Sequence, residues 1–430
     1  MTGRRRFLAL GAAVLAAPAV VRAQPLLDAE VVVIGAGAAG IAAARQLIAW
    51  DYDVIVLEAR ARVGGRAWTA GGALGLDWDR GAQWLHNGLE NPLRAEAAAL
   101  GRRVTPSVYD DMQVTRGGGP DAGQATGLLD ALGALDRRID RTARGAGLGA
   151  TMADIAQTGP WDRAAVAIAA LSMGGDPASV SLADAALLDS GEDALVEGGK
   201  GGLLQALARD LPVRTGHAVT TLDLRPADHV AVAGAFGTLR AGVALVTLPP
   251  VLLSRGALRV TPELPGWKQD ALGALGPAEF AKVGLRLSGA VPAGPEFAVD
   301  LAAVDAGESA LLHLDPRAPL ASVLFAGSHA AALQAEGPRA LAEAARALLR
   351  HHTGLEAVAT ESHDWAADPH SLGPWARVQP GADGAREAYA AAIDGRLLFA
   401  GEAVPGPMAT TLGGAWAAGL AAADEIWDAT

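Results

Sequence analysis

The sequence predicts a mixed α/β fold that is organised around a βαβ unit near its N-terminal end. A short β-branched run at 30–34 is typical of a buried parallel strand. It leads through a glycine-rich turn at 35–40 into an alanine-rich helical stretch at 41–50. A second apolar strand follows at 53–57 and ends in Glu58. Strand, turn, helix and strand in this order indicate a parallel sheet with a crossover helix.

The composition excludes several classes of protein. The 430 residues carry 35 basic and 47 acidic side chains, and the formal charge of −12 argues against a nucleic-acid partner, since such proteins present a basic face. With 51% hydrophobic and 19% charged residues the chain can bury a large core, and its length predicts two or three domains of about 150 residues. Cysteine is absent, which excludes disulfides, thiolate metal sites, cysteine nucleophiles and a cofactor tethered through cysteine.

The first 23 residues have the features of an export signal. Arg4, Arg5 and Arg6 precede an apolar run that is too short to span a hydrocarbon core of about 30 Å and that ends at a small-residue cleavage site around Ala23. The paired arginines resemble a twin-arginine signal, so we predict a signal peptide at 1–23, the twin-arginine machinery as export partner, and a periplasmic or secreted mature protein. An ordinary secretory signal, or a basic start followed by a helix, is the alternative. We expect no stable membrane anchor.

Each residue of the glycine-rich turn has a physical role in binding a dinucleotide. Gly35 permits the tight turn, Gly37 lets a pyrophosphate approach the backbone, and Gly40 lets the helix pack against the strand. Ala38 and Ala39 present free N–H groups at the positive end of the helix dipole. With 54 glycines in the chain, however, the GxGxxG spacing alone also fits a glycine-rich turn of an unrelated α/β sheet.

Glu58 stands where a carboxylate accepts hydrogen bonds from both ribose hydroxyls of an adenosine. The same charge repels a 2′-phosphate, which disfavours NADP. The βαβ unit by itself leaves FAD and NAD open.

Residues 58–66 resemble the E-A-R-x-R-x-G-G-R run of the flavin amine oxidase family. FAD is longer than one βαβ unit can hold, so further backbone and an arginine must line its pyrophosphate and ribityl chain. Gly64 and Gly65 offer bare backbone, and Arg66 offers a fork that matches phosphate. The alternative for the arginines is a solvated basic loop. This resemblance implies FAD contacts from Glu58, Ala59, Arg60, Gly64, Gly65 and Arg66.

Further stretches resemble motifs of the same family along the whole chain. Residues 80–86 are similar to its G-A-Q-W-x-H stretch, residues 197–203 to its glycine-rich return loop, and residues 246–249 to its V-x-T-x-P strand end. Residues 398–403 strongly resemble its F-A-G-E-A motif, and 413–419 its last helix start. The further FAD-binding residues that this resemblance implies are Gly81, Ala82, Gln83, Trp84, Val219, Gly401, Glu402, Thr411 and Leu412.

The resemblance also implies the domain organisation, which is that of the monoamine oxidase type. A Rossmann-like FAD-binding domain is interrupted by a substrate-binding domain made of helices and a sheet. We predict the first domain from 24–90, 196–265 and 376–430, and the second from 91–195 and 266–375. Inside the insert, apolar spacing predicts helices over 128–139 and 164–173, and a polar, glycine-rich composition predicts a loop at 116–127.

Lys282 is the first candidate for the chemistry. It lies in the period-2 stretch 280–287, which predicts a strand with Lys282, Gly284 and Arg286 on one face. The family places a lysine at the matching position, where it holds a water against flavin N5. A merely solvated strand face would give the same alternation.

Aromatic side chains frame the substrate in this family. Trp375 occupies the place of the first wall, but Thr411 stands where the second aromatic wall is expected. This departure implies a bulkier or differently oriented substrate than a small aromatic monoamine. For Trp365 and Trp416 we expect ordinary core packing.

The resemblance implies FAD-dependent oxidation of a small-molecule amine, with hydride transfer to flavin N5 and an imine that hydrolyses to a carbonyl product. We expect FAD to be held non-covalently and to be reoxidised by O2 or a periplasmic electron carrier. No histidine spacing typical of a metal site is present, so no metal is predicted. The alternatives are a flavin desaturase or protoporphyrinogen-oxidase-like enzyme, and a flavin-binding protein without turnover.

Overall fold

The structure, a computed structural model, describes residues 27–107, 109, 112–116, 122–143, 145, 149–187 and 191–429. The predicted signal peptide at 1–23 lies outside the described residues. Within the described part of the chain, none of the helices is both long and apolar enough to cross a membrane.

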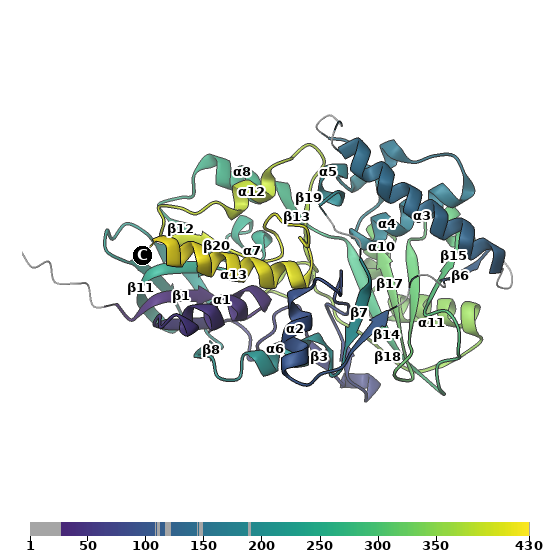
Figure 1. Ribbon diagram of the computed structural model, residues 1–430, viewed down its shortest axis with the longest axis horizontal. Coiled ribbons are helices and arrows are strands. Elements are labelled where there is room, and N and C mark those ends of the chain that lie inside the picture. The colour runs from purple at the N-terminus through teal and green to yellow at the C-terminus, as the bar shows by residue number, and fades with distance from the viewer. Residues whose placement is uncertain are drawn as a thin grey trace, which may run out of the picture.

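Two large β-sheets lie side by side along the long axis of the molecule (Figure 1). The first has eight strands in the order β12-β9-β10-β11-β1-β2-β8, with β20 paired to β11. Strands β20, β11, β1, β2 and β8 pair in parallel, whereas β10 is antiparallel to both neighbours. The strands are β1 (Ala29–Ile34), β2 (Val54–Glu58), β8 (Val213–Thr215), β9 (Val219–Asp223), β10 (Val230–Gly234), β11 (Gly237–Val246), β12 (Arg259–Thr261) and β20 (Leu397–Phe399).

Helices cover both faces of the eight-stranded sheet, which explains why its central strands are apolar throughout. Val31 and Val33 pack into one cluster with helices α1 (Ala38–Ala49) and α13 (Leu412–Ala429). Val32 and Ile34 point the other way, into a second cluster. Helices α7 (Pro250–Ser254), α8 (Gly266–Ala274) and α12 (Ala385–Ala390) contribute to that cluster.

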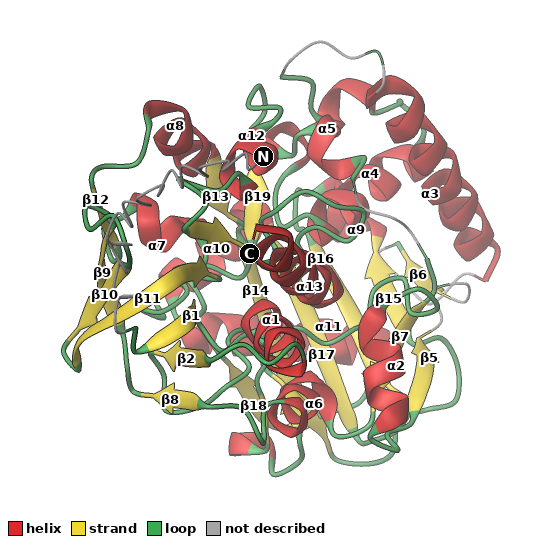
Figure 2. Ribbon diagram, turned by 60° about the vertical axis from the view of Figure 1, so that its left-hand side comes forward, coloured by secondary structure: helices red, strands yellow, loops and turns green. Residues whose placement is uncertain are grey.

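Helices α1 and α13 lie together over the first sheet (Figure 2). A Cβ on Gly419 of α13 would lie 2.1 Å from the carbonyl oxygen of Ala39 in α1. Glycine at this position therefore lets the last helix of the chain approach the first turn of α1, so that the two ends of the described chain build one layer.

The second sheet has six strands in the order β18-β14-β17-β16-β15-β6, antiparallel except for the β15–β6 pair. Its strands are β6 (Met112–Thr115), β14 (Phe280–Leu287), β15 (Phe297–Asp300), β16 (Ala310–Asp315), β17 (Leu320–Ala326) and β18 (Ala357–Ser362). Helices α3 (Ala122–Ala143) and α4 (Pro160–Ser172) pack on one face, and α10 (Gly327–Glu336) and α11 (Pro338–Thr353) on the other.

Short elements connect the two sheets. Three two-stranded sheets pair β3 (Thr69–Ala70) with β4 (Trp78–Asp79), β5 (Val104–Ser107) with β7 (Asp193–Val196), and β13 (Leu275–Pro277) with β19 (Ala376–Val378). The remaining α-helices are α2 (Pro92–Ala99), α5 (Leu182–Ala185), α6 (Gly199–Leu207) and α9 (Leu301–Asp305).

Every strand of the first sheet comes from the three segments predicted to bind FAD, and every strand of the second from the two inserted segments. The bounds of the two predicted domains stay a prediction. One expectation was wrong, because helix α3 begins at Ala122, inside the loop predicted at 116–127. A Cβ on Gly127 would lie 2.8 Å from the indole of Trp161 in α4, so close packing of α3 on α4 uses this glycine within a helix.

Candidate active site

Glu58 at the end of β2 holds the glycine-rich turn that follows β1. Its carboxylate is only 4% exposed and accepts a hydrogen bond from the backbone N–H of Ala36 at 2.9 Å. A Cβ on Gly40 would lie 1.9 Å from a carbonyl oxygen of the same turn, whereas one on Gly37 would meet nothing within 4 Å. Glycine at 40 is therefore required by packing, and open space in front of Gly37 is left for a ligand at the N-terminus of α1.

The backbone of Gly64 and Gly65, which carries no side chains, lies over this turn. The N–H of Gly64 donates to the carbonyl oxygen of Ala36 at 2.8 Å, and a Cβ on Gly65 would lie 3.5 Å from the Cα of Gly37. Both glycines have positive φ, 94° and 56°. The two glycine segments thus form one cradle that a side chain at either place would fill.

Arg66 connects this cradle with the C-terminal part of the chain. Its Nη1 donates to Oε1 of Glu402 at 3.0 Å and to the carbonyl oxygen of Pro374 at 3.1 Å. The Glu402 carboxylate also accepts from the backbone N–H of Ala376 at 3.1 Å and is 8% exposed. Because a carboxylate has about four acceptor positions, Glu402 keeps capacity for a ligand hydroxyl.

Arg60 has a side-chain partner that the sequence did not indicate. Its Nη2 forms an ion pair with Asp368 at 2.8 Å, and its backbone N–H donates to Glu58. The side chains of Arg60 and Arg66 are 13% and 22% exposed. The two arginines therefore do not form a solvated basic loop.

The N-terminus of α13 is capped by Thr411. The Thr411 hydroxyl accepts from the backbone N–H of Gly414 at 3.0 Å and donates to the carbonyl oxygen of Met408 at 2.7 Å, and Leu412 is the first helical residue. A Cβ on Gly401 would have one neighbour within 4 Å, the Thr247 carbonyl oxygen at 3.8 Å. This helix start thus combines a positive dipole end with a glycine that exposes backbone.

Lys282 is buried in the interior rather than on a solvated face. It is 6% exposed, and its ammonium group donates to the carbonyl oxygens of Asp79 and of Gly81, the latter at 2.7 Å. A third acceptor is Oε1 of Gln83 at 3.2 Å. Three acceptors match the three N–H bonds of an ammonium group. Burial lowers the pKa of Lys282 to about 7, against the opposing effect of the Asp79 carboxylate.

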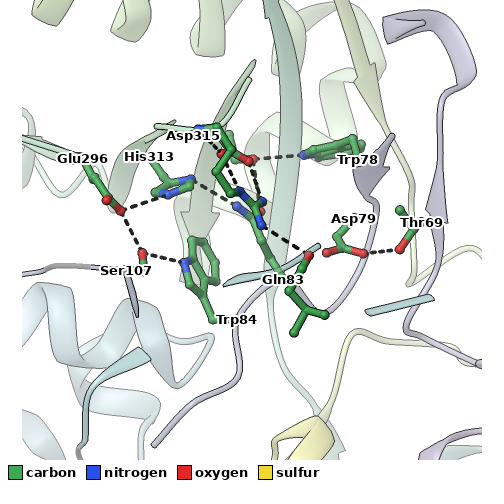
Figure 3. Close-up of polar contacts among 12 residues, drawn as sticks. Thr69, Trp78, Asp79, Gln83, Trp84, Ser107, Glu296, His313 and Asp315 are labelled. Atoms are coloured by element: carbon green, nitrogen blue, oxygen red, sulfur yellow. Dashed lines mark hydrogen bonds and ion pairs between the residues drawn. The ribbon is translucent and has the colours of Figure 1, made fainter. Parts of the chain in front are cut away.

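Gln83 joins Lys282 to a buried polar network, shown in Figure 3. Its Nε2 lies 3.1 Å from Nδ1 of His313, and its Oε1 also accepts from the hydroxyl of Ser322 at 3.1 Å. The His313 ring is fully buried on β16. Beyond it lie Glu296 and, through Ser107, the indole of Trp84.

Trp375 lies next to β14, the strand that carries Lys282. Its ring packs on Phe280, with centroids 4.8 Å apart, and its Nε1 donates to the carbonyl oxygen of Met173 at 3.3 Å. Phe280 and Lys282 share one face of β14, because they are two residues apart on a strand. Trp375 also lines a cavity together with Arg66, Pro249, Gly373 and Ala376.

The other predicted residues lie at the following places. Gly81 contacts Arg66 so closely that its Cβ would lie 1.7 Å from the Arg66 carbonyl oxygen, and Ala82 donates to the same oxygen at 3.3 Å. Trp84 packs toward the second sheet, 5.1 Å from the His313 ring. Val219 begins β9 in the first sheet. Trp416 is core, as expected, and Ala38, Ala39 and Ala59 stand at the start of α1 and beside Glu58.

Two features were missed by sequence reasoning. Asp79 is buried and accepts from the backbone N–H of Lys200 at 3.0 Å, so its charge lies close to Lys200 and Lys282. Arg386 and Asp184 form an ion pair at 2.6 Å with both side chains 1% exposed. Arg386 also donates to the Ala403 carbonyl oxygen at 3.0 Å, which fixes the loop after Glu402. No local pattern in the sequence indicates either partner.

These observations fit FAD as the bound group. A glycine cradle at a helix N-terminus suits its pyrophosphate, buried Glu58 suits its ribose, and Glu402 with Arg66 suits its ribityl chain. Among the residues that the structure describes, no cluster of three or more histidine, aspartate or glutamate side chains is arranged to hold a metal ion.

Several known proteins are similar in sequence to this chain. A relative from Oryza sativa subsp. indica, lysine-specific histone demethylase 1 homolog 3, is 30% identical over an alignment of 457 positions, which covers 94% of this chain and 54% of that protein. Polyamine oxidase 4 of Oryza sativa subsp. japonica is 27% identical, with 92% of this chain and 88% of that protein covered. The chain thus spans about half the length of the histone demethylase homologue that it matches.

Solved structures show the same fold. Cyclohexylamine oxidase from Brevibacterium oxydans IH-35A has a TM-score of 0.79 at 23% identity, covering 94% of this chain and 99% of that one. A cofactor-binding variant of putrescine oxidase has a TM-score of 0.81 at 18% identity, covering 94% and 99%. The predicted fold class, a mixed α/β fold with a sheet-based FAD-binding part, is confirmed.

The family described as flavin-containing amine oxidoreductase matches residues 38–126 and 129–427. This range includes the glycine cradle except its first residues, and it includes Glu58, Lys282 and Glu402. The cofactor that the family implies is FAD, as predicted. The chain therefore belongs to the flavin-containing amine oxidoreductase family.

Proposed function

We propose that the protein oxidises a small-molecule amine with non-covalently bound FAD. The observation that carries the proposal is the burial of Lys282. Its Nζ lies between β14, the strand that carries it, and the 79–83 segment, which follows the proposed FAD-binding cradle along the chain. FAD supplies the acceptor for a hydride equivalent from the carbon that bears the amine, and the imine product then hydrolyses to a carbonyl compound.

The residues of this chain orient and shield the reaction. Trp375 and Phe280 form an apolar wall next to Lys282, which excludes water from the reacting carbon. Thr411 at the matching second wall caps α13 instead of presenting a ring. A cage with a single aromatic wall favours an amine that is bulkier than a flat aromatic monoamine.

Lys282 is suited to hold a water for proton transfer near neutral pH. With a pKa of about 7 it changes charge near neutral pH. In its charged form all three N–H bonds have protein acceptors, so binding such a water requires either loss of the proton or release of one acceptor.

The test is anaerobic mixing of the holoprotein with a panel of amines. Cyclohexylamine, putrescine and longer polyamines are chosen because relatives and structural neighbours carry these names. We expect at least one amine to bleach the flavin absorbance. If none does, while dithionite does, the proposal fails and a flavin-binding protein without turnover is supported. A desaturase-like activity is supported if no amine bleaches the flavin absorbance but a substrate with conjugated carbon–carbon double bonds does.

Reoxidation separates two electron acceptors, O2 and a periplasmic carrier. Admitting air to the amine-reduced protein is expected to restore the flavin band within seconds if O2 is the acceptor. Slow recovery in air, accelerated by an added cytochrome or quinone, supports a carrier. Release of the flavin by SDS tests the non-covalent attachment, which is supported by the absence of a cysteine that could tether the flavin.

We also propose export of the folded holoprotein by the twin-arginine route, supported by Arg4, Arg5, Arg6 and the apolar run that follows them. The triple substitution R4K, R5K and R6K is expected to retain the precursor inside the cell, whereas the unchanged chain is processed and found in the periplasmic fraction. Export of the triple variant at the normal level would exclude the route.

A further inference from the structure

We propose that His313 is a positioning residue for amine oxidation, which acts through the side-chain amide of Gln83 on the hydrogen-bond donors of Lys282. The inference rests on the proposed function, because it assigns a reason for the placement of Lys282. His313 is fully buried on β16, in the second sheet, and it does not touch Lys282 itself.

Donor-only groups determine the direction of every hydrogen bond around Gln83. The indole Nε1 of Trp78 can only donate, and it donates to the hydroxyl oxygen of Ser322 at 3.0 Å. The Ser322 hydroxyl is then free to donate to Oε1 of Gln83 at 3.1 Å. Lys282 also donates to this oxygen, at 3.2 Å. With two donors facing it, this atom must be the amide oxygen, so the amide nitrogen faces His313.

This orientation determines the tautomer of His313. The Nε2 of Gln83 carries only hydrogens to donate, so Nδ1 of His313, 3.1 Å away, must accept. The ring proton therefore resides on Nε2 of the histidine. That nitrogen faces Oε2 of Glu296 at 3.8 Å, across a gap longer than a hydrogen bond.

The far end of the network is fixed in the same way. The Trp84 indole donates to the Ser107 hydroxyl at 3.2 Å, and Ser107 donates to Oε2 of Glu296 at 3.0 Å. The His313 ring is also packed by Trp84, with centroids 5.1 Å apart, and by Phe297, at 4.9 Å. The Trp78 indole thus sets the hydrogen-bond directions from Ser322 to His313, and the Trp84 indole sets those of Ser107 and Glu296 on the far side of the gap.

The tautomer of His313 affects Lys282 because Gln83 is the one side chain among the three acceptors of the Lys282 N–H groups. The other two are backbone carbonyl oxygens of the 79–81 segment, which are held by the fold. If Nδ1 of His313 carried the proton, two N–H groups would oppose each other, and Gln83 would have to turn its NH2 group toward Lys282. The lysine would then lose one acceptor and face a donor instead.

The matched variants are His313→Leu and His313→Asn in the FAD-loaded protein. The two side chains have nearly the same size, but only asparagine offers an acceptor in the place of Nδ1. We expect the leucine variant to lower the rate of anaerobic flavin reduction by the best amine roughly tenfold, which corresponds to about 1.4 kcal/mol, and the asparagine variant to restore it to within about twofold. His229→Leu, at the residue before β10 in the first sheet, is the control for loss of a histidine.

Equal rates in the wild type and His313→Leu, or an equal loss in both variants, would overturn the inference. If no amine reduces the wild-type flavin, the proposed function fails instead, so the two failures are distinguishable. FAD content and melting temperature of each variant show whether a lower rate reflects misfolding.

A second measurement needs no kinetics. Imidazole 15N NMR of the holoprotein, with its nine histidines, is expected to show one resonance pair for unprotonated Nδ1 and protonated Nε2 that disappears in His313→Asn. A protonated Nδ1 at this residue would overturn the inference. In Gln83→Glu, which puts a second acceptor in place of the donor, we expect the proton of His313 to move to Nδ1.

Discussion

Arg66 donates from Nη1 to Oε1 of Glu402 at 3.0 Å, a contact between two residues that are 336 positions apart. Arg66 belongs to the cradle after β2, and Glu402 to the loop after β20. Their contact joins the N-terminal and C-terminal parts of the chain at the proposed FAD site. The same carboxylate fixes the N–H of Ala376, next to Trp375, so the proposed cofactor and substrate groups share one support.

The first prediction concerns this contact. Glu402→Gln keeps the shape but removes the charge that pairs with Arg66, so we expect FAD to bind roughly tenfold more weakly. The measurement is titration of apoprotein with FAD, followed by flavin fluorescence. Glu356→Gln, which changes an exposed pair with Arg350, is the control. An unchanged dissociation constant for Glu402→Gln would show that the pair is structural only.

Two glycines of the turn are expected to respond differently to alanine. In Gly37→Ala the new Cβ meets nothing within 4 Å, so the apoprotein should fold normally but lose FAD, because the methyl group occupies the place of the pyrophosphate. In Gly40→Ala the Cβ would lie 1.9 Å from the Gly35 carbonyl oxygen, so the fold itself should be destabilised. Circular dichroism melting and flavin content separate these outcomes. Normal FAD content in Gly37→Ala would contradict the placement of the pyrophosphate.

The buried ion pair between Arg386 and Asp184 is expected to contribute strongly to stability. Asp184→Asn leaves a buried guanidinium without its charge partner, so we expect the free energy of unfolding to fall by about 3–5 kcal/mol. Urea denaturation of the holoprotein measures it. The exposed pair Arg350–Glu356 provides the control Arg350→Met, which should change little. A small effect of Asp184→Asn would mean that water or a neighbouring group replaces the carboxylate.

Stability is expected to rise with pH above neutrality. Burial lowers the pKa of Lys200 to about 8, and that of Lys268 and Lys282 to about 7, whereas unfolded lysines titrate near 10.4. Between these values the unfolded chain binds more protons than the folded one, so the free energy of unfolding rises with pH from about 7 to about 10.

Lys282→Met tests this explanation, because it removes one of the three lysines that bind a proton in the unfolded chain but lose it in the folded one. We expect the slope of unfolding free energy against pH to fall by up to about 1.4 kcal/mol per pH unit in that window. Denaturant titrations at pH 7, 8 and 9 provide the slopes. Equal slopes for the variant and the wild type would contradict a lowered pKa at Lys282.

Lys282→Met is also expected to slow flavin reduction or reoxidation while FAD stays bound, since its Nζ contacts protein groups beside the proposed reaction site. Stopped-flow absorbance at the flavin band measures both steps. Arg286→Met, an exposed change on the same strand, should leave both rates unchanged. Unchanged rates in Lys282→Met would remove this lysine from the chemistry.

Local pattern was sufficient for much of the fold. The β-branched run at 30–34 and the alternation at 280–287 predict strands, because side-chain periodicity reflects which faces are buried. Helix α3 was misplaced at its start, because Gly127 favours a loop locally but packs under Trp161 in the folded chain. Such an override by tertiary packing leaves no trace in a short window of sequence.

The sequence by itself determined the βαβ unit, the residues proposed to bind FAD and the candidacy of Lys282, since all of these depend on neighbours in the chain or on motifs of a family. Tertiary structure alone decided the partners, such as Glu402 for Arg66, Asp184 for Arg386 and Gln83 with His313 behind Lys282. It also decided that all three lysines are buried, which is what lowers the pKa of each. The physical reason is that desolvation and hydrogen-bond direction depend on groups brought together from more than a hundred residues apart, where periodicity and spacing carry no information.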